Sequence, residues 1–312
     1  MQVVSDTRLD VASGISQGRR PYQEDAIVTD FSLGTELGFA VLADGMGGHA
    51  AGDVASKIVV TEVFSELKLQ SGDAAAFRAN LPDILRDAAL AANDCVKVHI
   101  QSNAETAGMG ATLLAPVFVG ARLFWISIGD SPLLLYRGGV LRQLNEDHSM
   151  APQIDFMVQT GMLSEEMGRN HPDRSCLTSV LGGEDVPRID CPREPCALQD
   201  GDILIAASDG IQYLSYDEIA ALLDRHADRP SHAIAEALLA ALEAHGDPEQ
   251  DNATFTVVKV ALGRTSSLRL ANGGAAGAAA QRPEREFAAR APSRFRSALL
   301  MRGAAIFRGL AQ

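Results

Sequence analysis

From residue 38 the sequence reads Gly38-Phe-Ala-Val-Leu-Ala-Asp44-Gly-Met-Gly-Gly-His49, where a short apolar run gives way to a glycine-rich loop that begins with an acidic residue. Short apolar runs bounded by turn residues are typical of buried β-strands. The same pattern recurs at Asp202-Ile-Leu-Ile-Ala-Ala-Ser-Asp209-Gly210. We therefore expect two buried strands, each of which ends in an Asp-Gly pair at the start of a functional loop.

Other apolar runs predict the remaining strands. Four of them form two pairs whose members are separated by only two small residues, which is a hairpin signal. The runs are Thr112–Val119 with Arg122–Ile128, Leu133–Arg137 with Val140–Leu144, and Thr254–Leu262 alone. Helical spacing of apolar residues predicts helices at Gly52–Leu69, Leu81–Ile100 and Ser231–His245. Because hairpins are many and strand–helix–strand units are few, an α+β class with antiparallel sheets and outer helices is favoured over a doubly wound parallel sheet.

Composition and charge restrict the class of protein. Of the 312 residues 46% are hydrophobic and 21% are charged, which is enough apolar material to bury a core. The formal net charge is −13, and this excludes nucleic acid as the main partner because binding a phosphate backbone requires a basic surface. Met1–Gly14 lacks a basic start followed by an apolar run, so no signal peptide is expected, and no apolar stretch is long enough to span a bilayer.

The four cysteines are scattered along the chain, at Cys95, Cys176, Cys191 and Cys196. The last two could form half of a zinc site, but a second pair is missing and no histidine lies close by in the sequence. Scattered cysteines without such a pattern are typical of reduced thiols in a cytosolic protein. We therefore expect a cytoplasmic protein.

The charge is divided unevenly between the body and the C-terminal part of the chain. From Arg264 onward there are nine Arg and two Glu, a net charge of +7, which leaves −20 on the preceding residues. Leu270–Ala280 is almost all Ala, Gly and Asn, which is typical of a flexible linker. Ser293–Leu310 alternates Arg with apolar residues and could form a basic amphipathic helix. We expect a domain over residues 1–263 and a linker with a basic tail over residues 264–312.

The function of this tail is left open by the sequence. A basic amphipathic helix could lie on an anionic membrane surface. It could equally bind the acidic body or a partner protein, because opposite charges attract. The remaining alternative is a terminus without a task.

Acidic residues stand at five boundaries between predicted elements. They are Glu24-Asp25, Asp44, Asp130, Asp209 and Asp251. Carboxylates that crowd together raise one another's pKa unless cations neutralise them. Oxygen ligands without His or Cys favour Mg²⁺ or Mn²⁺ over zinc. Two such ions can activate a water and clamp a phosphoryl group, and an Arg nearby, such as Arg20, suits bidentate phosphate binding.

Each of these signals is weak alone, because a single Asp-Gly pair is usually a turn. Their joint occurrence in order, each beside a strand, is specific. The set resembles the type-2C protein serine/threonine phosphatases, the Mg²⁺/Mn²⁺-dependent PPM family, in their bacterial form. The matching motifs are Arg20-x-x-Gln-Glu24-Asp25, Asp44-Gly-Met-Gly-Gly-His-x-x-Gly52-x-x-Ala55-Ser56, Gly108-Met-Gly-Ala-Thr112, Gly129-Asp130-Ser131, Asp147-His148-Ser149, His171-Pro-x-Arg174, Leu177-Thr178, Leu181-Gly182, Ser208-Asp209-Gly210 and Asp251-Asn-x-Thr254.

The resemblance covers Gly14 to about Leu262 and implies a fold and an activity. The fold would be a central sandwich of two antiparallel sheets flanked by helices, a four-layer αββα arrangement, with the metals at one end. The activity would be hydrolysis of phosphoserine and phosphothreonine in proteins that a cognate Ser/Thr kinase phosphorylates. The segment of about residues 150–183 resembles the family's flap subdomain, in which Met157, Met162 and Met167 would supply apolar contacts.

The resemblance also implies the role of each site residue. Asp44 would bridge two tight Mn²⁺ or Mg²⁺ ions, and Asp209 and Asp251 would complete the shell of the first. Glu24 or Asp25, with the Gly45 carbonyl, would hold the second. Asp130 would support a third, weaker ion, and Arg20 would bind the substrate phosphate.

The chain departs from the family pattern beside the expected ligands. Met46 stands where many eukaryotic members have a His that is proposed to protonate the leaving group, and Met cannot donate that proton. His49 is the nearest residue in the sequence that could donate the proton instead, although a histidine in such a loop is more often only hydrogen-bonded to the backbone. Pro132 and Gln23 replace a usual Arg and a common Asn.

Two other functions remain as alternatives. A phosphatase for a small phosphate ester would need a deep, enclosed pocket. A regulatory or scaffold protein of the same fold would normally lose metal ligands, and the retention of Asp44, Asp209 and Asp251 counts against it.

Overall fold

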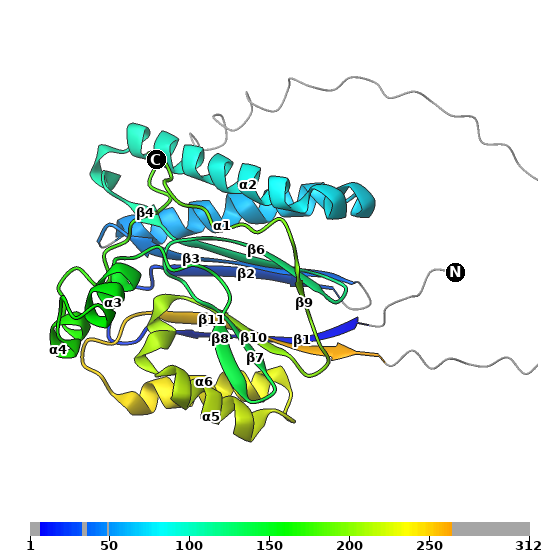
Figure 1. Cartoon of the computed structure of the whole chain (residues 1–312). Helices are drawn as coiled ribbons and strands as arrows, with labels where there is room; N and C mark the ends of the chain where they lie inside the picture. The colour runs from blue at the N-terminus through cyan, green and yellow to red at the C-terminus, as the bar shows by residue number, and fades with distance from the viewer. Residues whose placement is uncertain (1–6, 33–35, 49, 264–312) are drawn as a thin grey trace, which may run out of the picture. The chain divides into compact units, whose positions relative to one another are not determined.

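The computed structural model describes residues 7–32, 36–48 and 50–263, and shows two stacked antiparallel sheets between two pairs of helices (Figure 1). The expected linker and basic tail, residues 264–312, and the catalytic candidate His49 lie outside the described residues. Within the described part of the chain, no helix combines the length and the apolar character needed to cross a membrane.

Every strand pairing in the two sheets is antiparallel. The first sheet has the order β1 (Thr7–Ser16), β11 (Ala253–Leu262), β10 (Ile203–Ala207), β7 (Leu133–Arg137) and β8 (Val140–Gln143). The second has the order β2 (Asp25–Phe31), β3 (Leu37–Met46), β5 (Leu113–Val119), β6 (Arg122–Ile128) and β9 (Cys196–Ala197), and the short β4 (Gly110–Ala111) also pairs with β3. This is the α+β sandwich that the sequence and the resemblance predict.

Helices cover the outer face of each sheet. α1 (Ala50–Gln70) and α2 (Ala74–Ser102) contact the second sheet, and α5 (Tyr216–His226) and α6 (Ser231–His245) contact the first. The short helices α3 (Ala151–Gln159) and α4 (Glu165–Arg169) lie at one end of the sandwich (Figure 1). Two 3₁₀ turns complete the set, η1 (Ala104–Thr106) after α2 and η2 (Asp209–Tyr213) after β10. The layers therefore follow the order α, β, β, α.

The core is divided into three apolar layers, and the central strands contribute to two of them. On β10, Ile203 and Ile205 pack against α5 and α6, whereas Leu204 packs between the sheets. On β5, Leu113 faces α1 and α2, whereas Phe118 faces the other sheet. Side chains alternate across a strand, so a strand that is covered on both faces needs apolar residues at every position. This is why these strands appear in the sequence as continuous apolar runs.

The predicted strands that correspond to β3, β5, β6, β7, β8, β10 and β11 are confirmed to within two residues. β1 and β2 were not predicted. They lie at the edges of their sheets and are only partly buried, so each retains polar residues and lacks a continuous apolar run.

The helix predictions are correct for α1 and α6 and incomplete elsewhere. α2 begins at Ala74 rather than at Leu81, because the Asp73 side chain accepts hydrogen bonds from the first free N–H groups and caps the helix there. The helix continues through Pro82. With the expected start at Leu81, this proline would have been in the first turn. α5 was missed, although Ser215 and Glu218 form a capping box at its start.

Candidate metal centre

The acidic sites meet at one end of the sandwich because strands that are distant in sequence end there. Asp25 begins β2 and lies opposite Asp44 near the end of β3. Asp209 follows β10, and Asp251 precedes β11, the strand that pairs with β10. Asp130 follows β6. These sites, which are separated by up to 226 residues in the chain, are therefore brought together by the pairing of strands within each sheet and by the stacking of the two sheets.

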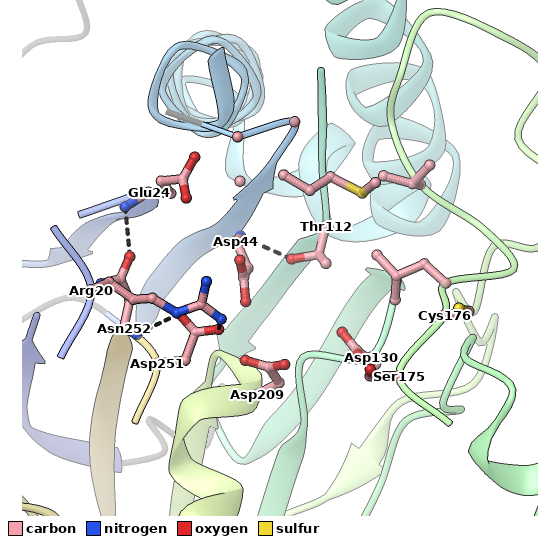
Figure 2. Close-up of a pocket in the computed structure, with 16 residues that line it drawn as sticks. Arg20, Glu24, Asp44, Thr112, Asp130, Ser175, Cys176, Asp209, Asp251 and Asn252 are labelled. Atoms are coloured by element: carbon pink, nitrogen blue, oxygen red, sulfur yellow. Dashed lines mark hydrogen bonds and ion pairs between the residues drawn. The ribbon is translucent and has the colours of Figure 1, made fainter. Parts of the chain in front are cut away.

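A pocket of about 570 Å³ lies at this end of the molecule. Five carboxylates line it, those of Glu24, Asp44, Asp130, Asp209 and Asp251. In Figure 2 Asp44 lies in the middle of the view, with the other carboxylates around it. A second wall is apolar or weakly polar and consists of Met46, Cys176, Leu177 and Val180. The pocket thus combines concentrated negative charge with a less polar side.

Burial and crowding shift the titration of these acids. Burial, opposed in part by a hydrogen bond from Ser208, raises the pKa of Asp25 to about 7. Burial and the neighbouring Asp209 raise the pKa of Asp130 to about 7. Burial, reinforced by four nearby aspartates, raises the pKa of Asp44 well above its usual range. A divalent cation would reverse these shifts, because it favours the charged form of each carboxylate.

The chemistry of the donor set fits a hard divalent cation. The candidate ligands are carboxylate and carbonyl oxygens, which Mg²⁺ and Mn²⁺ prefer. Gly45 also lines the pocket, and a Cβ there would lie 2.1 Å from the Gly52 carbonyl oxygen and 2.7 Å from that of Glu24. Only glycine therefore allows the end of β3, the first turn of α1 and the backbone before β2 to approach so closely.

The carboxylates converge on the pocket without forming a finished coordination shell. Among residues 7–32, 36–48 and 50–263, no three His, Cys, Asp or Glu side chains are grouped closely enough to hold an ion as they stand. The Arg20 guanidinium lies 2.5 Å from Asp251 Oδ2 (Figure 2). Arg20 was expected to bind a substrate phosphate; in this structure it lies in the pocket and is paired with an expected metal ligand.

The structure separates the two acids of the Glu24-Asp25 pair. Glu24 lines the pocket, whereas Asp25 does not. The Asp25 carboxylate is buried, and its Oδ2 accepts a hydrogen bond of 2.8 Å from Ser208 Oγ. Its Oδ1 is buried without a hydrogen-bond partner among the described residues. Asp25 thus lies behind the wall of the pocket.

Sequence reasoning assigned no role to two polar residues of the pocket, Thr112 and Asn252. Asn252 Oδ1 accepts a hydrogen bond of 2.7 Å from the Glu24 N–H, and its Nδ2 donates to the carbonyls of Gln17 and Tyr22. It therefore ties the segment that carries Arg20 and Glu24 to the start of β11. Its position directly after Asp251 was the available signal.

The segment of about residues 150–183, which was predicted to be a flap, supplies most of the less polar wall of the pocket. Ser175, Cys176 and Leu177 line the pocket after α4. Arg174, which precedes them, makes two hydrogen bonds of 2.7 and 3.1 Å to the Asp155 carboxylate in α3 and so anchors this wall to the short helices. Met162 and Met167, which belong to the same segment, do not enter the core, since they are 68% and 58% exposed.

Comparison with known proteins places this arrangement in a family. The family model for protein phosphatase 2C matches residues 18–245 of the chain. The chain belongs to the protein phosphatase 2C family. The serine/threonine phosphatase stp of Listeria monocytogenes is 34% identical over 171 residues, a match that spans 55% of this chain and 65% of that protein.

Solved structures of this family share the sandwich. The crystal structure of the Mycobacterium tuberculosis serine/threonine phosphatase PstP/Ppp is 30% identical, with a TM-score of 0.63, and the match covers 81% of this chain and 99% of that one. A structure of the PstP catalytic domain in complex with two manganese ions is also 30% identical, with a TM-score of 0.61, covering 82% of this chain and 99% of that one.

The rim of the pocket carries a departure from many eukaryotic members of the protein phosphatase 2C family. Met46 lines the pocket and is 42% exposed, at the position where those members have a His. Its thioether is a weak hydrogen-bond acceptor and carries no proton to donate. Proton transfer to a leaving group therefore cannot come from this side chain.

Proposed function

We propose that the chain is a metal-dependent protein phosphatase that hydrolyses phosphoserine and phosphothreonine. The observation that supports this most directly is the convergence of five carboxylates on one pocket in a protein phosphatase 2C fold. The raised pKa values of Asp44, Asp130 and Asp209 indicate a site that is suited to divalent cations. When bound, Mn²⁺ or Mg²⁺ supplies a Lewis acid that activates water and neutralises phosphoryl charge.

The proposed ligand set follows the walls of the pocket. Asp44, in the middle, would contact two ions, with Asp209 and Asp251 on the side of the first. Glu24 and the Gly45 carbonyl would hold the second, since both line the pocket. We assign Asp25 a supporting role, because its carboxylate is bonded to Ser208 behind the wall.

We propose two further roles at the edges of this site. Asp130, at the opposite side of the pocket from Arg20 in Figure 2, would support a third, weaker ion. Arg20 would bind the substrate phosphate, for which its planar guanidinium offers paired donors. Its side chain is 50% exposed, so it can reach a phosphate at the mouth of the pocket as well as Asp251.

Phosphoproteins suit this pocket better than a small ester does. The segments at its mouth are exposed, including Met46, Gly47, Gly48 and Cys176. A phosphorylated side chain on a protein surface could approach there, whereas a small ester would need an enclosed pocket to contact most of its surface. All five acidic side chains face one pocket, which disfavours the scaffold alternative. The four free cysteines are consistent with the proposed cytoplasmic location. A Ser/Thr kinase that phosphorylates the same substrates is the proposed counterpart of this enzyme.

Phosphate release from a phosphothreonine peptide tests this proposal. The purified protein should release phosphate with Mn²⁺ or Mg²⁺, and excess chelator should abolish the release. Asp209→Asn should lower turnover by more than the about 10–100-fold that is typical of residues that merely support a ligand. Full activity in chelator would refute the metal dependence. If the Asn variant had the same turnover as the parent protein, Asp209 would not be a ligand that the reaction needs.

A further inference from the structure

A buried chain of polar groups joins the centre of the pocket to the turn that carries Asp130. The Asp44 N–H donates a hydrogen bond of 2.9 Å to Thr112 Oγ1 (Figure 2). Thr112 Oγ1 lies 2.9 Å from Ser131 Oγ in a second hydrogen bond. Asn145 Nδ2 donates a bond of 3.0 Å to the Ser131 carbonyl. Thr112 and Ser131 are 2% and 1% exposed, so water does not replace these partners.

Through its N–H and its methyl group, Thr112 also contacts the backbone at Asp44 and directly before Asp130. Its N–H donates a hydrogen bond of 2.9 Å to the Asp44 carbonyl, so one residue holds both peptide groups of Asp44. Gly129, which precedes Asp130, has a φ of +103°, and a Cβ there would lie 2.6 Å from Thr112 Cγ2. The Thr112 methyl therefore packs directly against the backbone that leads into Asp130.

The chain of bonds connects parts of the fold that belong to different sheets. Asp44 lies in β3 of the second sheet. Thr112 lies between β4 and β5, both of which pair with β3. Asn145 follows β8 of the first sheet, and its Oδ1 accepts a hydrogen bond of 2.7 Å from the Leu133 N–H at the start of β7. A shift at Ser131 would thus be transmitted to Asp44 through a single hydroxyl.

We propose that Thr112 is a positioning residue of the metal centre, whose hydroxyl holds Asp44 in register with the Gly129–Ser131 turn. This inference rests on the proposed function, because it assumes that Asp44 and Asp130 serve cations. A hydroxyl has one proton and two lone pairs, so it can accept from the Asp44 N–H while bonded to Ser131. Without it, a buried N–H beside the central carboxylate loses its partner, and the arrangement of the ligands loosens.

Two substitutions at this residue separate its hydroxyl from its shape. Thr112→Val keeps the branched volume against Gly129 and removes the hydroxyl. Thr112→Ser keeps the hydroxyl and removes the methyl. Mn²⁺ affinity of each full-length protein, stripped with chelator and titrated calorimetrically without substrate, is the readout. We expect the Val variant to bind Mn²⁺ about tenfold more weakly, the effect of one lost buried hydrogen bond, and the Ser variant to stay within about threefold of the parent.

The partner hydroxyl provides an independent variant. Ser131→Ala should weaken Mn²⁺ binding in the same direction, and the double variant with Thr112→Val should be no weaker than the more affected single variant, because both remove one shared connection. Ser131→Ala also carries the test if the Val variant fails to fold, which its thermal melt would reveal. Both measurements are made in the absence of substrate.

Three results would overturn the proposal. Unchanged Mn²⁺ affinity in the folded Val variant would show that the hydroxyl has no positioning role. Equal weakening by Val and Ser would assign the effect to shape. Additive effects in the double variant would show that the two hydroxyls act separately. If the parent protein bound Mn²⁺ but released no phosphate, the proposed function would fail while the role of Thr112 remained supported by its affinities.

Discussion

At the scale of single residues, Arg20 is the only basic side chain among the described residues that line the pocket. It shares the pocket with five carboxylates and forms an ion pair with one of them, Asp251. The same pair means that Arg20 and a cation compete for one carboxylate. Its proposed task therefore concerns the substrate rather than the metals.

Arg20→Ala should reduce kcat/KM for a phosphopeptide by about 10–100-fold, the range expected from losing a charged hydrogen bond to phosphate. Mn²⁺ affinity should be equal to that of the parent protein or tighter, because Asp251 is released from its ion pair. Arg20→Lys should retain part of the activity, since it keeps the charge and loses the paired donors. Steady-state kinetics and calorimetry check these outcomes. Weaker Mn²⁺ binding in the Ala variant would instead make Arg20 a structural residue.

At the scale of elements, local signals and burial specify different parts of the fold. α5 begins with a reciprocal capping box, in which Ser215 Oγ accepts from the Glu218 N–H and Glu218 Oε2 accepts from the Ser215 N–H. Ile219, Leu222 and Leu223 then face the first sheet. The helix covers the outer face of that sheet, away from the residues that line the pocket.

Ser215→Ala should lower the free energy of unfolding by about 1 kcal/mol, the usual cost of losing a capping side chain. Denaturant unfolding of the two proteins measures this difference. Ser215→Thr keeps the hydroxyl and is the matched control, which should lose less. Phosphatase activity should be unchanged in both, and a large loss of activity in the Ala variant would contradict the separation of α5 from the site.

The strands show which elements could be predicted and why. Central strands such as β5 and β10 are buried on both faces and appear in the sequence as continuous apolar runs. The edge strands β1 and β2 are only partly buried and retain polar residues, so the apolar-run signal fails for them. The place of β1 in its sheet depends on pairing with β11, which is distant in the sequence, and that of β2 on pairing with β3.

At the scale of the whole molecule, the sandwich closes by joining the two ends of the described chain. β1 pairs along its full length with β11, from Thr7 opposite Leu262 to Ser16 opposite Ala253. Since β11 pairs on both sides, with β1 and with β10, we propose that the catalytic unit is complete at the end of this strand.

Removal of residues 265–312 should leave a folded protein with the same Mn²⁺ dependence and with activity within about threefold of the full chain. Circular dichroism and phosphopeptide hydrolysis check this. An insoluble or inactive truncated protein would show that the tail belongs to the domain. If activity is retained, sedimentation with anionic vesicles tests the proposed surface binding of the basic tail. Equal binding by both forms would exclude the tail as the cause.

The class of fold, the central strands and the acidic residues could be predicted from the sequence alone. Burial on both faces produces continuous apolar runs, and turns have characteristic residues, so both are visible in local composition. The sequence could not decide between Glu24 and Asp25, since only the packed sheets define which of these two adjacent side chains faces the pocket. The pairing of Arg20 with Asp251 and the bonds of Thr112 to Asp44 and Ser131 were likewise set by tertiary structure. Each joins residues whose separation in the chain carries no local signal, and each arises only when distant strands pair and the two sheets stack.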